Sequence, residues 1–165
     1  MANVRIQPSR ALAIVKSNNA DIPYPAVNTS GTSGAVVVNY LVDATKDFQA
    51  LNVYPGDIVY NTQTGLAATV TEAAVTGATD RVKLNADIFL AANTYVIYQS
   101  SPMAGGQNTG CILYVGTTGD VVVTTAGNDI VIFKNVQGFI PVQVLKLWST
   151  SGALTTTAAD VLALW

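Results

Sequence analysis

The side chains most often used in catalysis and metal binding are scarce in this chain. Histidine is absent, which excludes the commonest general base, the commonest metal ligand and every Ser–His or Cys–His nucleophile scheme. Glu72 is the only glutamate, and it lies in a predicted hairpin strand where exposure to solvent is expected. Paired carboxylates would therefore have to come from aspartates.

The aspartates stand where backbone capping explains them. Asp57, Asp120 and Asp129 lie beside glycine or asparagine at predicted turns, where a short carboxylate accepts hydrogen bonds from backbone N–H groups. A second group flanks two predicted one-turn helical segments, where N-capping is expected. That group comprises Asp43, Asp47 and Asp87. A glycosidase-like pair of aspartates is the alternative interpretation.

The sequence gives weak support to a calcium site, a phosphate-binding loop and a reactive thiol. Asn18–Asp21 and Gly127–Asp129 could each hold calcium, but neither provides the dense, regularly spaced oxygen ligands of a calcium loop. Gly105-Gly106 lacks the lysine and the helix of a phosphate-binding loop. Cys111 is the only cysteine, so it forms no disulfide within the chain. We expect a small buried hydrophobe there, with a reactive thiol as the alternative.

The cations and aromatic residues of the predicted strands are also expected to have structural roles instead of forming a site. Lys134 and Lys146 are expected to be isolated, solvated cations. The tyrosines at strand positions are expected to pack in a core or an interface, and a sugar-stacking platform is the alternative. These tyrosines are Tyr54, Tyr60, Tyr95, Tyr98 and Tyr114. Together these residues predict no catalytic site, no metal, no cofactor and a protein that is not an enzyme.

The composition indicates which kinds of partner the chain is expected to bind. Half of the residues are hydrophobic and 11% are charged, with a formal net charge of −2. This charge gives no electrostatic footprint for nucleic acid, and the short apolar runs do not suffice to cross a bilayer. No signal peptide is visible, and a single cysteine fits assembly in the reducing cytoplasm. So few charges predict that partners cover much of the surface and that the chain self-associates.

Residues 111–165 alternate between strand-like runs and turn chemistry. Five runs rich in Val, Ile, Leu and Phe are separated by predicted turns that include Thr118–Asp120, Ala126–Asp129 and Gln137–Gly138. This alternation predicts an all-β fold made of antiparallel sandwich or barrel modules. The apolar end, Val161–Trp165, is expected to be buried, because chain ends fray unless a sheet or a partner holds them.

The N-terminal part is predicted to be a separate small β-module. It begins with an extended arm and a strand within residues 6–15, and Ser30–Gly34 is predicted to be a flexible loop. Further strands are predicted at Val36–Val42, Asp57–Asn61, Ala67–Glu72, Arg81–Leu84 and Thr94–Tyr98. The predicted organisation is an arm and module over 1–99, a Gly/Ser/Pro linker over 100–110 and a second module over 111–165. A single sandwich with one long loop is the alternative.

A resemblance supports the C-terminal module. Residues 111–165 resemble the spike-base module of tailed phages and gene transfer agents. The residues that carry the resemblance are Leu113-Tyr114-Val115-Gly116, Gly119-Asp120-Val121, Val131–Val136, Pro141-Val142 and Ala163-Leu164-Trp165. One departure is Ser149–Ala153, which stands where that module has a tighter Gly-Thr-Thr-Ala turn. No role is therefore carried over to that turn.

A second resemblance covers most of residues 10–99. The strand Gly56–Asn61 followed by Ala68–Thr71, then Asp87–Phe89 and Tyr95–Tyr98, is similar to a small β-barrel-like module of phage structural proteins, especially those of cyanophages. This resemblance implies a virion module without indicating its position on the particle.

Together the resemblances imply a virion structural protein that is assembled in the host cytoplasm. On the capsid it would be a decoration (cement) protein or the base of a head spike. A tail or baseplate protein and a carbohydrate-binding host-recognition module are the alternatives. We expect a homo-oligomer, a trimer first and a pentamer next, with the phage major capsid protein as partner and neither nucleic acid nor membrane bound. The capsid contacts are expected from Met1–Arg10 and Asn18–Gly34.

Overall fold

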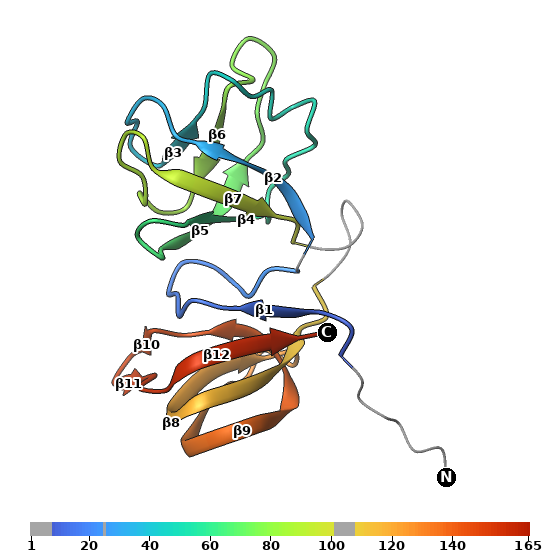
Figure 1. Ribbon diagram of the computed structural model, residues 1–165, viewed down its shortest axis with the longest axis vertical. Helices are drawn as coiled ribbons and strands as arrows, with labels where there is room; N and C mark the ends of the chain where they lie inside the picture. Colours follow the sequence, from blue (N-terminus) through green and yellow to red (C-terminus); the bar gives the residue numbers. More distant parts are fainter. Residues whose placement is uncertain (1–7, 25, 101–107) are drawn as a thin grey trace. The chain divides into compact units, whose positions relative to one another are not determined.

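All regular elements in the described part of the chain are β-strands (Figure 1). The computed structural model describes residues 8–24, 26–100 and 108–165. Its strands lie in antiparallel sheets, which confirms the predicted all-β fold. The chain divides into two compact units. Unit 1 contains the described residues up to Lys16 together with Thr109–Trp165, and unit 2 is Ser17–Asn108.

Unit 2 contains a six-stranded sheet in the order β2-β7-β4-β5-β6-β3. Its strands are β2 (Val27–Thr32), β3 (Tyr40–Val42), β4 (Ile58–Asn61), β5 (Ala67–Glu72), β6 (Arg81–Leu84) and β7 (Thr94–Tyr98). The predicted ranges of β5, β6 and β7 are confirmed, and β4 begins one residue later than predicted. One face of this sheet buries an apolar core that includes Phe48, Val59 and Ile97.

Two predictions in unit 2 are wrong. Ser30–Gly34 is not a flexible loop, because Ser30, Gly31 and Thr32 pair with β7. Gly31 suits that position because a Cβ there would meet the Asp43 carboxylate at 2.5 Å. The strand predicted over Val36–Val42 is confined to Tyr40–Val42. Asn39 has a φ of 59°, a left-handed conformation that places a tight turn immediately before β3.

Unit 1 is built around a long hairpin flanked by two shorter strands in the order β1-β12-β8-β9. Its strands are β1 (Ala11–Ala13), β8 (Cys111–Thr125), β9 (Ile130–Leu147) and β12 (Ala159–Leu164), with a small hairpin of β10 (Thr150–Ser151) and β11 (Leu154–Thr155). Along β8 the residue numbers rise while those of the β9 partners fall, as in an antiparallel pair. The hairpin turns at the predicted Ala126–Asp129.

The hairpin curls until its two ends meet again. Val123 pairs with Val131 across the turn and also with Leu147 near the end of β9. The second half of β8 therefore has neighbours along both edges. This arrangement explains why three consecutive residues, Val121, Val122 and Val123, are fully buried, whereas a half-buried strand would alternate.

Two predicted turns in unit 1 are wrong, and glycine explains both. Thr118–Asp120 lies inside β8, where a Cβ on Gly119 would meet the Ala158 nitrogen at 2.4 Å. Gly119 thus permits the close approach of another backbone segment instead of forming a turn. Gln137–Gly138 lies inside β9, and Gly138 has a φ of 95° at a register shift, so the strand bends there without ending.

The strand near the N-terminus belongs to the C-terminal sheet. Ala11 pairs with Leu164, and the Trp165 carbonyl accepts hydrogen bonds from the Ser9 and Arg10 nitrogens. This finding differs from the predicted division at residue 99, which placed the first strand in the N-terminal module. The two paired strands, β1 and β12, lie near opposite ends of the chain, so their positions in the sequence do not indicate that they pair. Residues 101–107 of the predicted linker lie outside the described residues.

The expected burial of Val161–Trp165 holds for alternate residues only. β12 lies between β1 and β8, and its Val161 and Ala163 are buried. Leu162, Leu164 and Trp165 are half-buried. Two of these half-buried residues, Leu162 and Leu164, project from the opposite face of the sheet, which is the face described below.

Candidate interaction surface

Three aspartates of unit 2, Asp43, Asp47 and Asp57, hold the backbone, as predicted. The Asp43 carboxylate accepts hydrogen bonds from the Thr45 nitrogen at 3.0 Å and the Thr45 hydroxyl at 2.6 Å. The Asp47 carboxylate accepts from the Ala50 nitrogen at 2.9 Å. Asp57 accepts from the Tyr54 and Ser100 nitrogens, each at 3.0 Å. These contacts give each carboxylate a structural role.

Asp43 also lies against a buried phenol. The Tyr95 hydroxyl donates to the Asp43 carboxylate at 2.8 Å, and Tyr95 is 1% exposed. Burial raises the pKa of Asp43, but the hydrogen bonds from Thr45 and Tyr95 outweigh it and leave that pKa below its usual value. Burial and the neighbouring carboxylate raise the pKa of Tyr95. The pair is therefore a fixed donor and acceptor, without a titrating group near neutral pH.

A second buried polar residue, Asn61, was not singled out by sequence reasoning. Its amide donates to the Ile88 carbonyl at 2.8 Å and to the Asn93 side chain at 2.9 Å. Its side-chain oxygen accepts from the Gln63 and Thr64 nitrogens at 3.0 and 3.1 Å. The amide therefore joins three loop segments to β4. An asparagine followed by Thr-Gln-Thr-Gly at a strand end was the available signal.

In unit 1 the predicted isolated cations have partners. The Lys134 amine lies 2.6 Å from the Asp120 carboxylate and holds the pKa of Asp120 below its usual value. Lys146 lies 4.5 Å from the centre of the Trp148 ring. Asp120 lies within a strand, not in the predicted turn, although its carboxylate accepts a hydrogen bond from the Asn135 nitrogen at 3.1 Å.

Cys111 and the candidate metal segments have structural explanations. Cys111 is buried, its thiol donates to the Val144 carbonyl at 3.5 Å, and burial raises its pKa to about 12. Gly127–Asp129 is the tip of the β8–β9 hairpin, and Ser17 caps the turn that contains Asn18. Among the described residues, no three His, Cys, Asp or Glu side chains gather as metal ligands. No helix in that part of the chain could cross a membrane.

The feature of unit 1 that stands out is its second sheet face, which we call the outer face. Paired residues point to the same side of a sheet, so the register defines two rows across all four strands. One row contains Ala13, Leu162, Tyr114 and Phe139. The register places Ala11, Leu164 and Ile112 in the other row, and Pro141 joins them because it lines the same hollow as Ile112 and Leu164. All eight residues are apolar or aromatic and none is charged.

The inner face lies directly beneath these rows. Leu12, Ala163, Leu113 and Ile140 form the matching inner row, in which Ala163, Leu113 and Ile140 are at most 1% exposed. An antiparallel sheet with one solvated face normally alternates apolar residues inward and polar residues outward. This sheet is apolar on both faces. Polar residues therefore do not alternate with apolar ones where β1, β12, β8 and β9 meet in these rows.

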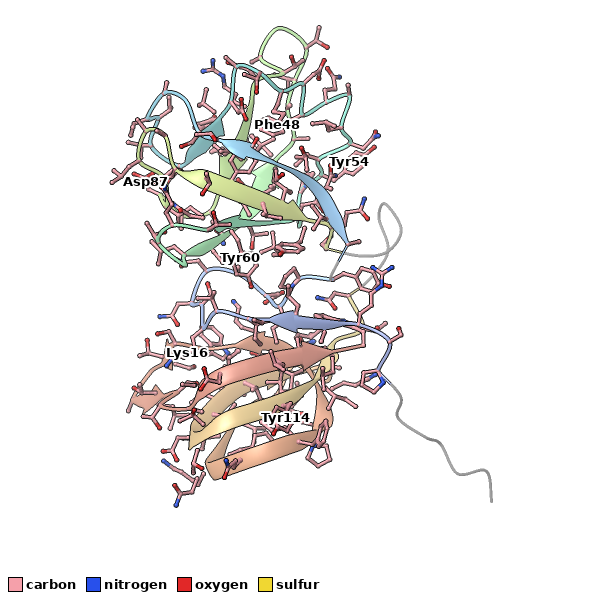
Figure 2. All side chains as sticks on the ribbon, viewed as in Figure 1. Lys16, Phe48, Tyr54, Tyr60, Asp87 and Tyr114 are labelled. Atoms are coloured by element: carbon pink, nitrogen blue, oxygen red, sulfur yellow. The ribbon has the colours of Figure 1, made fainter. Side chains whose placement is uncertain are left out.

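The outer face has both a protrusion and a recess. Phe139 is 65% exposed, and its ring lies 5.2 Å from that of Tyr114 in an edge-to-face contact (Figure 2 labels Tyr114). A hollow of about 270 Å³ is lined by Pro8, Ile112, Phe139, Pro141 and Leu164. Polar groups border the two rows. The Gln137 side chain bonds the Gly116 carbonyl on one side, and Gln143 lines a second hollow on the other.

This geometry argues against the sugar-stacking alternative on the outer face. A pyranose needs an open aromatic face together with polar groups that bond its hydroxyls. The Tyr114 and Phe139 rings are inclined by 68°, and the residues around the hollow are apolar. Of the other predicted tyrosines, Tyr60 and Tyr95 are buried, Tyr98 is half-buried and Tyr54 is exposed. Packing within unit 2 explains three of the five tyrosines, Tyr60, Tyr95 and Tyr98.

Comparison with known proteins found no matching family model, no similar curated protein and no similar solved structure.

Proposed function

We propose that this chain is a phage virion structural protein, a capsid decoration protein or the base of a head spike, which binds the capsid surface and stabilises it. The two sequence resemblances support this proposal. The C-terminal resemblance runs through β8, β9 and β12, which are neighbours in one sheet. Residues that are dispersed over residues 111–165 therefore belong to one contiguous piece of structure.

The observation that carries the proposal is the outer face of unit 1. Two adjacent rows of apolar side chains span four strands, and Phe139 is largely exposed on them. A surface of this kind is typical of a protein that acts by contact with other proteins. The carboxylates of Asp43, Asp47, Asp57 and Asp120 and the thiol of Cys111 are engaged in structural contacts. The two rows of the outer face contain no carboxylate, amine or thiol, so this surface suits adhesion better than catalysis.

For attachment to the shell we propose the N-terminal arm and the segment Asn18–Gly34, with the major capsid protein as partner. Residues 1–7 of the arm lie outside the described residues. Within the second segment, Val27–Thr32 forms β2, an edge strand with one neighbour, β7. An edge strand presents unpaired N–H and C=O groups along its free side, which another chain can bind.

The experiment that tests the proposal measures the protein on purified particles of the phage that encodes it. Quantitative mass spectrometry of heads and tails gives the copy number relative to the major capsid protein. Hundreds of copies on heads indicate decoration, and a few tens at most indicate a spike base. Absence from heads together with presence on tails would overturn the capsid proposal in favour of a tail protein.

Deletion of residues 1–7 then tests the arm without touching β1. Residues 8–10 are kept because the Ser9 and Arg10 nitrogens bond the Trp165 carbonyl. We expect lower occupancy on particles and release of DNA at a lower temperature. Arg5→Ala tests the contribution of one arm guanidinium, and Arg81→Ala, which removes a guanidinium paired with Asp80 in unit 2, is the matched control. Full occupancy without residues 1–7 would place the attachment elsewhere.

A further inference from the structure

We propose that a second copy of this chain covers the outer face of unit 1, with Phe139 as the central anchor of the contact. This inference rests on the proposed function, because it gives the assembly subunit a surface for self-association. It concerns contact between copies in solution and is separate from attachment to a capsid.

Both sheet faces of unit 1 are apolar where its four strands meet. The inner face buries Leu113, Ile140 and Ala163, so the core needs no further cover. The outer face presents a ring that is 65% exposed beside a hollow lined by Ile112, Pro141 and Leu164. No described segment of unit 1 fills this hollow. Apolar surface in such a position gains free energy when a partner removes it from water.

The absence of charge on the outer face favours a second copy as its occupant. Neither row of the outer face contains a charged side chain, so the face gives no electrostatic preference to a basic or an acidic partner. An uncharged apolar surface of the same dimensions is its best match, and every copy of the chain carries one. With a net charge of −2 per copy, repulsion between copies is small.

The shape of the outer face also fits a second copy. The exposed Phe139 ring and the hollow lie on the same face, so one copy offers both a protrusion and a recess. In a symmetric assembly every copy makes the same contacts. If the Phe139 ring of one copy enters the hollow of a neighbour, every other copy can do the same. A face-to-face pair and a closed ring both meet this condition. The number of copies is therefore a result of the experiment.

The free edge of β9 is a less suitable contact. This strand carries Lys134, and its backbone is irregular at Asn135 and Gly138, with φ values of 54° and 95°. Lysine and bulges are the features that keep edge strands from pairing with other chains. The edge therefore disfavours strand addition, while nothing comparable protects the outer face.

The size of the face sets the expected strength. Four strands about 4.8 Å apart and two rows about 7 Å apart give roughly 270 Å² of apolar surface. A standard specific interface buries about 800 Å² per partner, so the polar border with Gln137 and Gln143 must contribute. We expect association in the micromolar range, which is strengthened where neighbouring copies are held on a particle.

The test is sedimentation velocity of the full chain from low micromolar to several hundred micromolar concentration. We expect wild-type protein to associate and Phe139→Asp to weaken the association constant about thirtyfold or more, as for a central interface anchor. Leu90→Asp is the matched control, because Leu90 is 67% exposed and lies in unit 2. That variant should associate like wild type. Circular dichroism checks that each variant is folded, and Phe139→Ala is used if the aspartate variant is not.

Each outcome bears on the inference. A wild-type chain that stays monomeric throughout, or equal association of Phe139→Asp and wild type, would overturn it. Equal loss of association in Leu90→Asp would also overturn it, because the effect would then not be specific to the outer face. A monomer that still occupies phage heads would leave the proposed function standing. If the protein associates through Phe139 but is absent from particles, this inference stands and the proposed function is overturned.

Discussion

The sheets of the two units each carry a second apolar face, and only in unit 2 does the same unit cover it. In unit 2, Ile58, Tyr60 and Ala67 lie on the side of the sheet opposite the main core and pack with Ala20. Ala20 belongs to the segment that precedes β2. The outer face of unit 1 has no such cover among the described residues of its own unit.

The cover in unit 2 is fastened by specific contacts. The Asn19 carbonyl accepts hydrogen bonds from the Thr69 hydroxyl and the Asn85 amide. Tyr60 packs edge-to-face with Tyr98 at 5.5 Å, and Tyr60 is 8% exposed (Figure 2 labels Tyr60). The corresponding pair in unit 1, Tyr114 and Phe139, is 37% and 65% exposed. Similar aromatic pairs thus serve folding in one unit and remain available for association in the other.

The largest effect should come from removing the strand beneath the outer face. Deletion of residues 161–165 removes most of β12, the strand between β1 and β8, together with the buried Val161 and Ala163. We expect a loss above about 5 kcal/mol, the lower end of the stability of a whole domain, so unit 1 should not fold. Hydrogen exchange of peptides from 111–125 would show lost protection, with peptides from 58–72 as the internal control. Unchanged protection and an unchanged melting temperature would contradict this expectation.

The next test compares the two tyrosines. Tyr60→Ala should lower the free energy of unfolding of unit 2 by about 3 kcal/mol, because it truncates a buried aromatic residue. Tyr114→Ala should cost about 1 kcal/mol or less, since its side chain already meets solvent, while it weakens self-association. Urea unfolding and sedimentation measure the two quantities. Equal losses of stability, or a Tyr114 variant that associates normally, would remove the contrast between the units.

Much of unit 2 was predictable from sequence because its strands are short and end at clear turns. Thr62–Gly65 separates β4 from β5, and the predicted ranges of β5, β6 and β7 match the structure. Unit 1 was predictable in class but not in detail. Gly119 and Gly138 look like turn residues, but they permit close backbone approach and a bend within long strands.

The outer face was missed for a related reason. Phe139 directly follows the predicted turn at Gln137–Gly138, and a turn there hides its pairing with Tyr114. Which residues of β8, β9 and β12 face outward depends on register, and register depends on the bulges in β9. The pairing of Ala11 with Leu164 could not be predicted either, because it joins residues from opposite ends of the sequence. The available signal was the start of β8, Cys111–Val115, where the odd-numbered and the even-numbered residues are both apolar or aromatic.

Acid should weaken unit 2 through Asp43. The pKa of Asp43 is lowered in the folded state, so the unfolded chain binds a proton at higher pH than the folded chain does. The stability from Asp43 is therefore present above the ordinary aspartate pKa of about 3.9 and is lost as pH falls through the folded value. Asp43→Asn should cost about 1 to 2 kcal/mol at neutral pH and reduce the acid dependence of unit 2.

Denaturation of wild type and Asp43→Asn between neutral and acid pH measures this dependence. The outer face carries no carboxylate in its two rows, so self-association should stay constant wherever the protein is folded. Asp57 provides an internal check of opposite sign. Burial raises its pKa, so Asp57→Asn should not diminish the loss of stability in acid. Parallel pH curves for wild type and Asp43→Asn would rule out the role assigned to Asp43.

The smallest effect should come from Lys134, and it decides between the face and the edge of the same sheet. Lys134→Val removes an exposed ion pair with Asp120 and places a strand-forming residue on the free edge of β9. Surface ion pairs contribute little to stability, so we expect a melting temperature close to that of wild type. If copies meet through the outer face, association should also be unchanged, because Lys134 lies outside the two rows. If they met edge to edge, removal of the protecting charge would strengthen association and promote aggregation. Sedimentation of Lys134→Val beside Phe139→Asp therefore distinguishes the two surfaces: an effect confined to Phe139 supports the face, and tighter association of Lys134→Val would transfer the contact to the edge.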